Sequence, residues 1–352
     1  MKCDADIVVV GGGPAGAAAA IQARRSGASV ILLEADPSPR RRPGETVHSG
    51  AISIFNQLGV ETAVERSSGA RYDSISVNWA GRRSFDSSRI SPTEGRSLGF
   101  QIERSSLDAL LVERARSLGA DVRRPCRALQ PLIDDGRIVG VRTDLGELTA
   151  ASVIDASGTG SWLRKGVSLR EELASPRLIA RYGYCRSMDV RAFETPCLTG
   201  DREGWRWIAR VSTDTLAWVS VAFPNAPVRP CKPDPLLDLV DIGPTRGADV
   251  TWRRVATCSG MGFFIAGDAA FRVDPAAGHG ILRAMMSGMM AAYQAAQMIR
   301  KNICPDHVSR LYRGWMAEWW ERDTSALSSL YDELDPAWAR PRANQVHAQS
   351  GG

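Results

Sequence analysis

Three short segments of the chain are almost entirely apolar, and each ends at a glycine or an acidic residue. These are residues 7–10, 29–33 and 262–266. Runs of this length, in which polar residues do not alternate with apolar ones, predict strands that are buried on both faces. Such strands are typical of a parallel sheet covered by helices. We therefore expect an α/β core built from distant parts of the chain.

Helical periodicity marks four longer segments. In residues 105–118, Leu107, Leu111 and Ala115 fall on one face, and Gly119 follows as a stop signal. The other predicted helices are 17–26, 52–58 and 281–300. The first of them lies between two of the apolar runs, which gives the order strand, turn, helix, strand.

Alternating patterns indicate a second kind of sheet. Residues 75–79 alternate, and residues 178–224 are rich in Trp, Val and Tyr. Both patterns predict antiparallel strands outside the parallel core. The second sheet is therefore expected to be inserted between segments of the first.

A glycine-rich turn follows the first predicted strand and matches the pattern GxGxxG. Gly11 permits a tight turn, Gly13 allows the backbone to approach a pyrophosphate, and Gly16 allows close packing of helix and strand. Glu34 ends the second strand, where its carboxylate can accept hydrogen bonds from a ribose diol. The unit predicts a dinucleotide site, and the acid disfavours a 2′-phosphate.

Two further acidic turns follow predicted strands. They are Asp155-Ala-Ser-Gly158 and Gly267-Asp268. In this order after GxGxxG, they resemble the fingerprint of FAD-dependent aromatic hydroxylases and tryptophan halogenases. The resemblance implies FAD as cofactor and a GR2-type Rossmann-like FAD-binding domain. It also implies that Asp268 lies near the ribityl chain or the pyrophosphate, and that residues 274–280 form the loop beside the isoalloxazine ring.

The resemblance extends to an arginine that contacts FAD and to a loop near the flavin. Arg104 and the segment 44–46 match these features. The predicted cofactor-binding residues are Gly11, Gly13, Pro14, Ala15, Gly16, Glu34, Glu45, Thr46, Arg104, Asp155, Gly267, Asp268, Pro275, Gly278 and Gly280.

Longer segments resemble the flavoproteins that mature quinone-cofactor oxidases such as lysine ε-oxidase and glycine oxidase. The matching segments are GETVHSG (44–50), LGFQIERSSLD (98–108), GWRWIARV (204–211), RGADVTWRRV (246–255), residues 267–292 and WMAEWW (315–320). The resemblance implies a monooxygenase that hydroxylates a tryptophan of a partner protein during tryptophylquinone biogenesis. NAD(P)H would be a transient reductant, and O₂ the oxidant.

Alternative functions remain open at this stage. One is a small-molecule hydroxylase, oxidase or halogenase-like enzyme that acts on indoles or phenols, and another is a flavin-binding assembly factor without turnover. Halogenases of this superfamily carry an active-site lysine and a WxWxIP motif. This chain retains Trp205-Arg-Trp207-Ile but lacks the proline, and it has no lysine between Lys2 and Lys165.

Two histidines and two tryptophans are candidates for the reaction itself. His279 lies in the predicted flavin loop and His48 in the segment 44–50, so either could move a proton near neutral pH. The alternative for each is a structural hydrogen bond. Trp205 and Trp207 would face one side of a strand and could line the substrate cavity, or simply pack in the core.

The predicted domains follow from these assignments. The discontinuous FAD-binding domain takes residues 1–70, 100–165 and 255–300, and the inserted antiparallel substrate domain takes 71–99 and 166–254. A C-terminal helical segment covers 301–340, and a disordered tail 341–352. The prominent tryptophans of 315–320 are interpreted as a packing face.

The composition of the chain limits the partners, metals and cellular location that we expect. The net charge of +5 is carried by arginine, since only four lysines are present. We interpret this as compositional bias, with a basic docking surface as the alternative; neither nucleic-acid binding nor a membrane span is expected. Seven scattered cysteines without a CxxC pair indicate reduced thiols, a cytoplasmic location and no zinc site.

Overall fold

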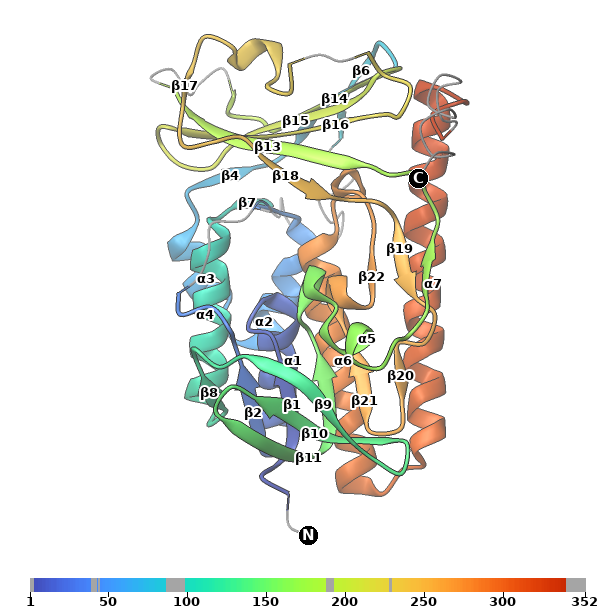
Figure 1. The fold of residues 1–352 in the computed structure, drawn as a ribbon. Helices are drawn as coiled ribbons and strands as arrows, with labels where there is room; N and C mark the ends of the chain where they lie inside the picture. Colours follow the sequence, from blue (N-terminus) through green and yellow to red (C-terminus); the bar gives the residue numbers. More distant parts are fainter. Residues whose placement is uncertain are drawn as a thin grey trace.

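The computed structural model describes residues 3–38, 43, 45–86, 99–187, 193–227 and 230–339. Gly44, residue 98 and the predicted tail 341–352 lie outside this range. Figure 1 shows an α/β unit with a second sheet stacked on one end of it, and a long C-terminal helix beside both. This arrangement confirms the predicted fold class.

The α/β unit is built on a sheet with strand order β20-β21-β11-β1-β2-β8. β1 lies at its centre, parallel to β2 on one side and to β11 on the other. Strands β9 and β10 extend the sheet antiparallel to β11. The strands are β1 (Ala5–Val10), β2 (Val30–Leu33), β8 (Asp121–Arg123), β9 (Ala128–Asp134), β10 (Arg137–Thr143), β11 (Gly146–Asp155), β20 (Ser259–Gly260) and β21 (Phe263–Ile265).

Seven α-helices surround the sheets in the described part of the chain. They are α1 (Pro14–Arg25), α2 (Ile52–Leu58), α3 (Glu61–Ser67), α4 (Arg104–Ser117), α5 (Trp162–Gly166), α6 (Gly280–Lys301) and α7 (Pro305–Leu334). α1 begins at Pro14, three residues before the predicted start, because proline suits the first helical position. α1 and α6 cross closely: a Cβ on Gly288 would lie 2.0 Å from the carbonyl oxygen of Ala15.

The second sheet has the order β17-β13-β16-β15-β14-β5-β6, and β18 also pairs with β13. All its pairings are antiparallel except that between β14 and β5. Its strands are β5 (Ile75–Trp79), β6 (Arg82–Asp86), β13 (Ile179–Arg186), β14 (Cys197–Asp201), β15 (Gly204–Arg210), β16 (Thr215–Ala222), β17 (Val240–Asp241) and β18 (Arg246–Asp249). The alternating patterns thus predicted this sheet correctly.

Two small sheets connect the layers. One has the order β3-β7-β4 and the other β12-β19-β22. Their strands are β3 (Thr46–Val47), β4 (Ala70–Tyr72), β7 (Gly99–Gln101), β12 (Glu171–Leu173), β19 (Arg253–Val255) and β22 (Phe271–Arg272). β22 lies between the second fingerprint aspartate and the predicted flavin loop.

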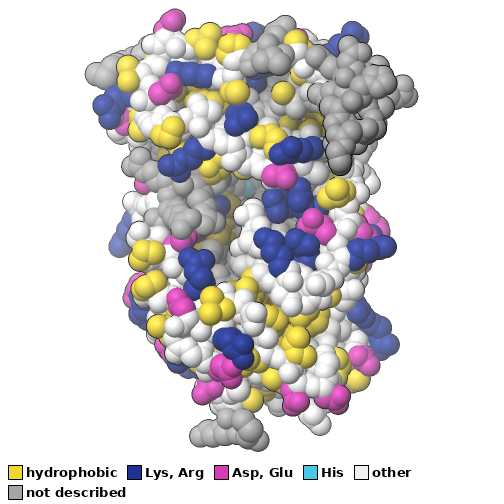
Figure 2. All heavy atoms as spheres, viewed as in Figure 1, with side chains coloured by type: hydrophobic (Ala, Val, Ile, Leu, Met, Phe, Trp, Pro, Cys, Tyr) yellow, Lys and Arg dark blue, Asp and Glu magenta, His cyan; other side chains and the backbone are white. Residues whose placement is uncertain are grey.

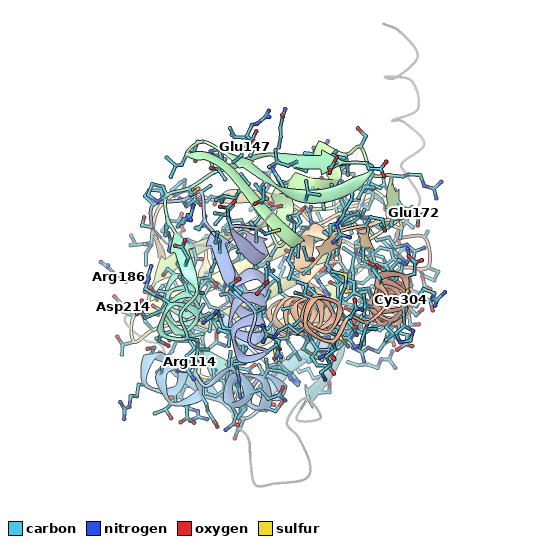
Figure 3. All side chains as sticks on the ribbon, turned by 90° about the horizontal axis from the view of Figure 1, so that it is seen from below. Arg114, Glu147, Glu172, Arg186, Asp214 and Cys304 are labelled. Carbon is cyan, nitrogen blue, oxygen red and sulfur yellow. The ribbon has the colours of Figure 1, made fainter. Side chains whose placement is uncertain are left out.

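Helix α7 holds the two layers together. Near its start, the Tyr312 hydroxyl donates to the carbonyl of Ile265 in β21, at 2.8 Å. Near its end, the carbonyl of Leu330 accepts from the indole of Trp79 in β5, at 2.9 Å. Figure 3, viewed from below, marks Cys304 just before α7. In the described part of the chain, no helix is long and apolar enough to cross a bilayer.

Candidate functional site

A cavity of about 590 Å³ lies between the carboxyl ends of the parallel strands and the second sheet. Its walls include the glycine-rich turn, residues of β13, β15 and β16, and the loop after β22. Figure 2 shows a hollow in this face of the molecule, with a histidine side chain visible inside it. The fold thus brings the predicted cofactor turn and the predicted substrate strands to one cavity.

The glycine-rich turn has the geometry that the motif requires. Gly11 has φ +104°, and a Cβ there would lie 2.5 Å from the carbonyl oxygen of Ala156. A Cβ on Gly16 would lie 1.8 Å from the carbonyl oxygen of Gly11. Gly13 differs, because a Cβ there would meet no atom within 4 Å. The backbone at Gly13 is therefore open at the N-terminus of α1, where a phosphate can approach.

Glu34 is fixed at the end of β2 and lines the cavity. One carboxylate oxygen accepts from the amide of Gly12 at 2.7 Å, and the other accepts from the amide of Asp36 at 2.8 Å. Each oxygen retains a further lone pair that can accept from a hydroxyl. The arrangement suits a ribose diol beside the glycine-rich turn.

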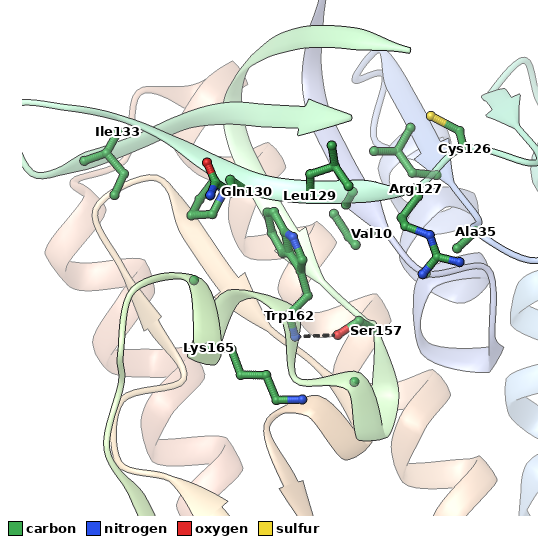
Figure 4. Close-up of a pocket in the computed structure, with 16 residues that line it drawn as sticks. Val10, Ala35, Cys126, Arg127, Leu129, Gln130, Ile133, Ser157, Trp162 and Lys165 are labelled. Carbon is green, nitrogen blue, oxygen red and sulfur yellow. Dashed lines mark hydrogen bonds between the residues drawn. The ribbon is translucent and has the colours of Figure 1, made fainter. Parts of the chain in front are cut away.

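A second cavity of about 800 Å³ adjoins the first, and Gly11 and Ser157 line both. Figure 4 shows its opposite walls: Cys126 lies on one side, and Trp162 and Lys165 of α5 lie on the other. The amide of Trp162 donates to the Ser157 hydroxyl at 2.9 Å. The two cavities thus adjoin at the glycine-rich turn.

Asp155, predicted as a cofactor contact, is fully buried and does not line either cavity, and its contact with a cofactor stays a prediction. Its two carboxylate oxygens accept from the amides of Ser157 at 2.9 Å and Leu163 at 2.8 Å. Burial raises the pKa of Asp155, and these bonds oppose the shift. Asp155 thus orders the turn that lines both cavities.

The other predicted cofactor residues divide into two groups. Gly16 and Gly267 shape the backbone without lining the first cavity, whereas the rest face it. Those that line it are Gly11, Gly13, Pro14, Ala15, Glu34, Glu45, Thr46, Arg104, Asp268, Pro275, Gly278 and Gly280. Their individual contacts with a cofactor remain predictions.

A hydrogen-bonded cluster from three strands forms one wall. The Tyr184 hydroxyl donates to the buried carboxylate of Glu45. The Thr46 hydroxyl donates to the side-chain oxygen of Gln101 at 2.9 Å. The amide nitrogen of Gln101 is buried without a partner, and Gln101 lines the cavity. Sequence reasoning missed Tyr184 and Gln101, although both belong to segments recognised as strands or motifs.

The two candidate histidines come together in the structure. The ring centroids of His48 and His279 lie 5.8 Å apart, in an edge-on arrangement. His48 lines the cavity, and its Nδ1 accepts from the amide of Gly50 at 2.9 Å. This bond favours the tautomer with the proton on Nε2. His279 lies between Gly278 and Gly280, which both line the cavity.

Trp205 and Trp207 both line the cavity from β15, as their spacing suggests. Trp205 is 2% exposed, and its indole nitrogen donates to the Tyr331 hydroxyl at 2.8 Å. Trp207 is partly exposed. Tyr182 extends the same aromatic wall from β13, because Tyr182 and Trp207 both stand opposite Val219 of β16. The wall suits a flat aromatic ring.

A buried acid links this wall to the predicted flavin loop. Asp274 accepts from the amide of Ala276 at 2.8 Å and lies 3.4 Å from the indole nitrogen of Trp205. It is also hydrogen-bonded to Tyr331. Burial raises the pKa of Asp274 to about 6. Sequence reasoning assigned no role to Tyr331, which lies on α7, 126 residues from Trp205.

Residues 6–172 match the family model described as FAD dependent oxidoreductase. FAD is thus the cofactor that the matched segment supports, in agreement with the open backbone at Gly13 and the fixed acid at Glu34.

Curated relatives extend the similarity over most of the chain. A 1H-pyrrole-2-carbonyl-[peptidyl-carrier protein] brominase of Pseudoalteromonas luteoviolacea is 28% identical, over 84% of this chain and 78% of its own. A digeranylgeranylglycerophospholipid reductase of Methanosphaerula palustris is 26% identical, over 86% and 79%.

Among solved structures, the myxobacterial chondrochloren halogenase superposes with a TM-score of 0.83 at 21% identity, covering 94% of this chain and 83% of its own. At this identity the likeness shows the fold alone. The fold of this chain is that of flavin-dependent halogenases and geranylgeranyl reductases.

Proposed function

We propose that this FAD-dependent oxidoreductase is a monooxygenase that hydroxylates an indole-type aromatic ring. The observation that carries the proposal is the shared cavity. Gly13, at the open end of α1, and Trp207, on the aromatic wall, line the same space. A ring held against Trp207 would therefore lie in the cavity that also receives the cofactor.

The chain's own residues supply binding and orientation. Gly11–Gly16 and the N-terminus of α1 would bind the pyrophosphate, and Glu34 the ribose. Gln101 offers a buried amide donor to the cavity. FAD, when bound and reduced by NAD(P)H, would supply the oxidising chemistry with O₂.

Proton movement would fall to the two histidines. His48 lines the cavity, and Nδ1 already accepts a backbone hydrogen bond, so Nε2 is the atom that can exchange a proton with a ligand. The ring centroid of His279 lies 5.8 Å from that of His48, so His279 would be the neighbouring group that relays this proton. The apolar faces of the aromatic wall would restrict water around the ring.

Halogenation is the less favoured alternative. Among the described residues that line the cavity there is no lysine, the group expected in a halogenase. Lys165 lines only the second cavity, on the other side of the glycine-rich turn.

The finer proposal is that the ring is the side chain of a tryptophan in a partner protein. Two considerations support it. The quoted sequence segments resemble flavoproteins that mature quinone-cofactor oxidases, and the substrate named for the brominase relative is a pyrrole carried by a protein. A free indole or phenol is the competing substrate class.

The test is mass spectrometry of the substrate. The FAD-loaded protein is incubated with NADH, O₂ and either a candidate partner protein or free indoles. The proposal expects mass gains in multiples of one oxygen atom on a partner tryptophan, which Trp207→Ala reduces. Oxygenation of free indoles alone would move the assignment to a small-molecule hydroxylase. Bound flavin that NAD(P)H cannot reduce would indicate an assembly factor.

A further inference from the structure

A basic rim borders the cavity beside the small sheet β12-β19-β22. Figure 2 shows basic side chains gathered at this edge of the hollow. Five arginines face three acids here, and ion pairs link four of the arginines to the acids. The four paired arginines are Arg164, Arg170, Arg253 and Arg254, and the acids are Glu171, Glu172 and Asp249. The fifth arginine, Arg272, is different.

Three arginines line the cavity, and two of them have acidic partners. Arg104 lies 3.3 Å from Asp108. Arg283 lies 2.7 Å from Asp323, and 3.7 Å from Asp268. Arg272 has no carboxylate within 4 Å among the described residues, and its Nη1 donates to the backbone carbonyl of Asp249, at 2.9 Å.

The guanidinium of Arg272 is thus partly desolvated and has no direct ion pair among the described residues. Its Nε is buried without an acceptor. Burial lowers the pKa of Arg272, while Asp268, Asp249 and Glu171 act on it from a distance in the opposite direction. Each of these three acids already pairs with another arginine. A guanidinium remains protonated near neutral pH and offers five donors, so it can bind a planar anion.

The position of Arg272 points to the substrate part of the cavity. The carbonyl that it contacts belongs to β18, which pairs with β13 of the second sheet. Asp249 stands opposite Ile179 of β13, and the next pair in the register, Ala180 and Ala248, lines the cavity. The flavin pyrophosphate already has the glycine-rich turn and the N-terminus of α1.

We propose that Arg272 binds a carboxylate on the substrate, so that the cavity selects an aromatic ring with an acidic group beside it. This inference rests on the proposed function only in taking the aromatic wall as the substrate site. The carboxylate has two possible sources, a free aromatic acid or an acidic residue next to a tryptophan in a partner protein.

Binding to the oxidised, FAD-loaded protein tests this without turnover. The probes are indole-3-acetate and its neutral counterpart indole-3-acetamide. The binding of each is measured from the change that it causes in the flavin absorbance. A charge-assisted bond to Arg272 predicts roughly tenfold tighter binding of the acid. A second pair of probes is a tryptophan peptide with an adjacent aspartate and the same peptide with asparagine.

Variants assign the preference to one residue. Arg272→Met should abolish the preference for the acid, and Arg272→Lys should retain part of it. Arg254→Met is the matched control, because Arg254 lies on the neighbouring strand β19 and pairs with Glu172, which does not act on Arg272, and it does not line the cavity. It should leave the preference unchanged.

Three outcomes would overturn the proposal. The first is equal binding of acid and amide by the unaltered protein. The second is a preference for the acid that persists in Arg272→Met. The third is a loss of FAD affinity in Arg272→Met with that preference intact, a result that would assign Arg272 to the flavin phosphates. A preference found in a protein that does not oxygenate indoles would support the anion site and refute the monooxygenase. The peptide and free-acid probes identify the source of the carboxylate.

Discussion

Replacing Asp274 with asparagine should remove the pH dependence that this buried carboxyl adds to the stability of the protein. Asp274 is 1% exposed, and it is held by the amide of Ala276 and by Tyr331. Burial raises its pKa from 3.8 to about 6. Asparagine has nearly the same shape and can keep both hydrogen bonds, but it never carries a charge.

The sign follows from proton binding. The native carboxyl keeps its proton to a higher pH than the unfolded chain does, so the native state binds more protons and the stability falls as the pH rises. The contribution is fully present below about pH 4 and is lost through pH 6. This difference in pKa corresponds to about 3 kcal/mol of stability, of which about 2 kcal/mol is lost between about pH 4.5 and about pH 8.

The assay is urea unfolding at both pH values with the same excess of FAD, because bound ligand adds its own stabilisation. The free energy of unfolding of Asp274→Asn, relative to the unaltered protein, should rise by about 2 kcal/mol between the lower and the higher pH. Asp335→Asn is the control, because Asp335 makes the same bond to an amide two residues ahead but is less buried. A difference between Asp274→Asn and the unaltered protein that is the same at both pH values would refute the reasoning.

Three further predictions concern packing and cofactor binding. Gly13→Val should lower FAD affinity by at least tenfold in a titration but leave the unfolding midpoint unchanged, because only open space surrounds that position; weakened folding would contradict this. Gly288→Ala should destabilise the protein by about 1–3 kcal/mol in urea, because its Cβ would meet the backbone of α1; neutral stability would show that the helices separate freely. Tyr331→Phe should cost more stability than Tyr312→Phe, by about 1 kcal/mol, because Tyr331 bonds two buried side chains and Tyr312 one carbonyl; equal losses would argue against the linked network.

Local features were predictable because neighbours in the sequence decide them. The turn from Gly11 to Gly16 needs only the conformations of consecutive residues, and the strands before and after it follow from uninterrupted apolar runs. The spacing of Trp205 and Trp207 likewise indicated a shared face, which lines the cavity.

Asp155 shows the limit of the same reasoning. Its sequence context, an acid after a buried strand, indicated a ligand contact. In the folded chain the amides of Ser157 and Leu163 are the donors within reach, so the carboxylate is used to order the loop. A sequence pattern can identify a hydrogen-bond acceptor, but it does not show which donor the fold places beside that acceptor.

By itself, then, the sequence determined the cofactor-binding turn, the two kinds of sheet and the elements that carry the candidate residues. Only the tertiary structure decided that Trp205, Asp274 and Tyr331 meet, and that Arg272 lines the cavity without an acidic partner in the described part of the chain. The physical reason is that backbone conformation and hydrophobic periodicity are local, whereas burial and charge pairing depend on which distant segments the fold brings within a few ångströms of each other.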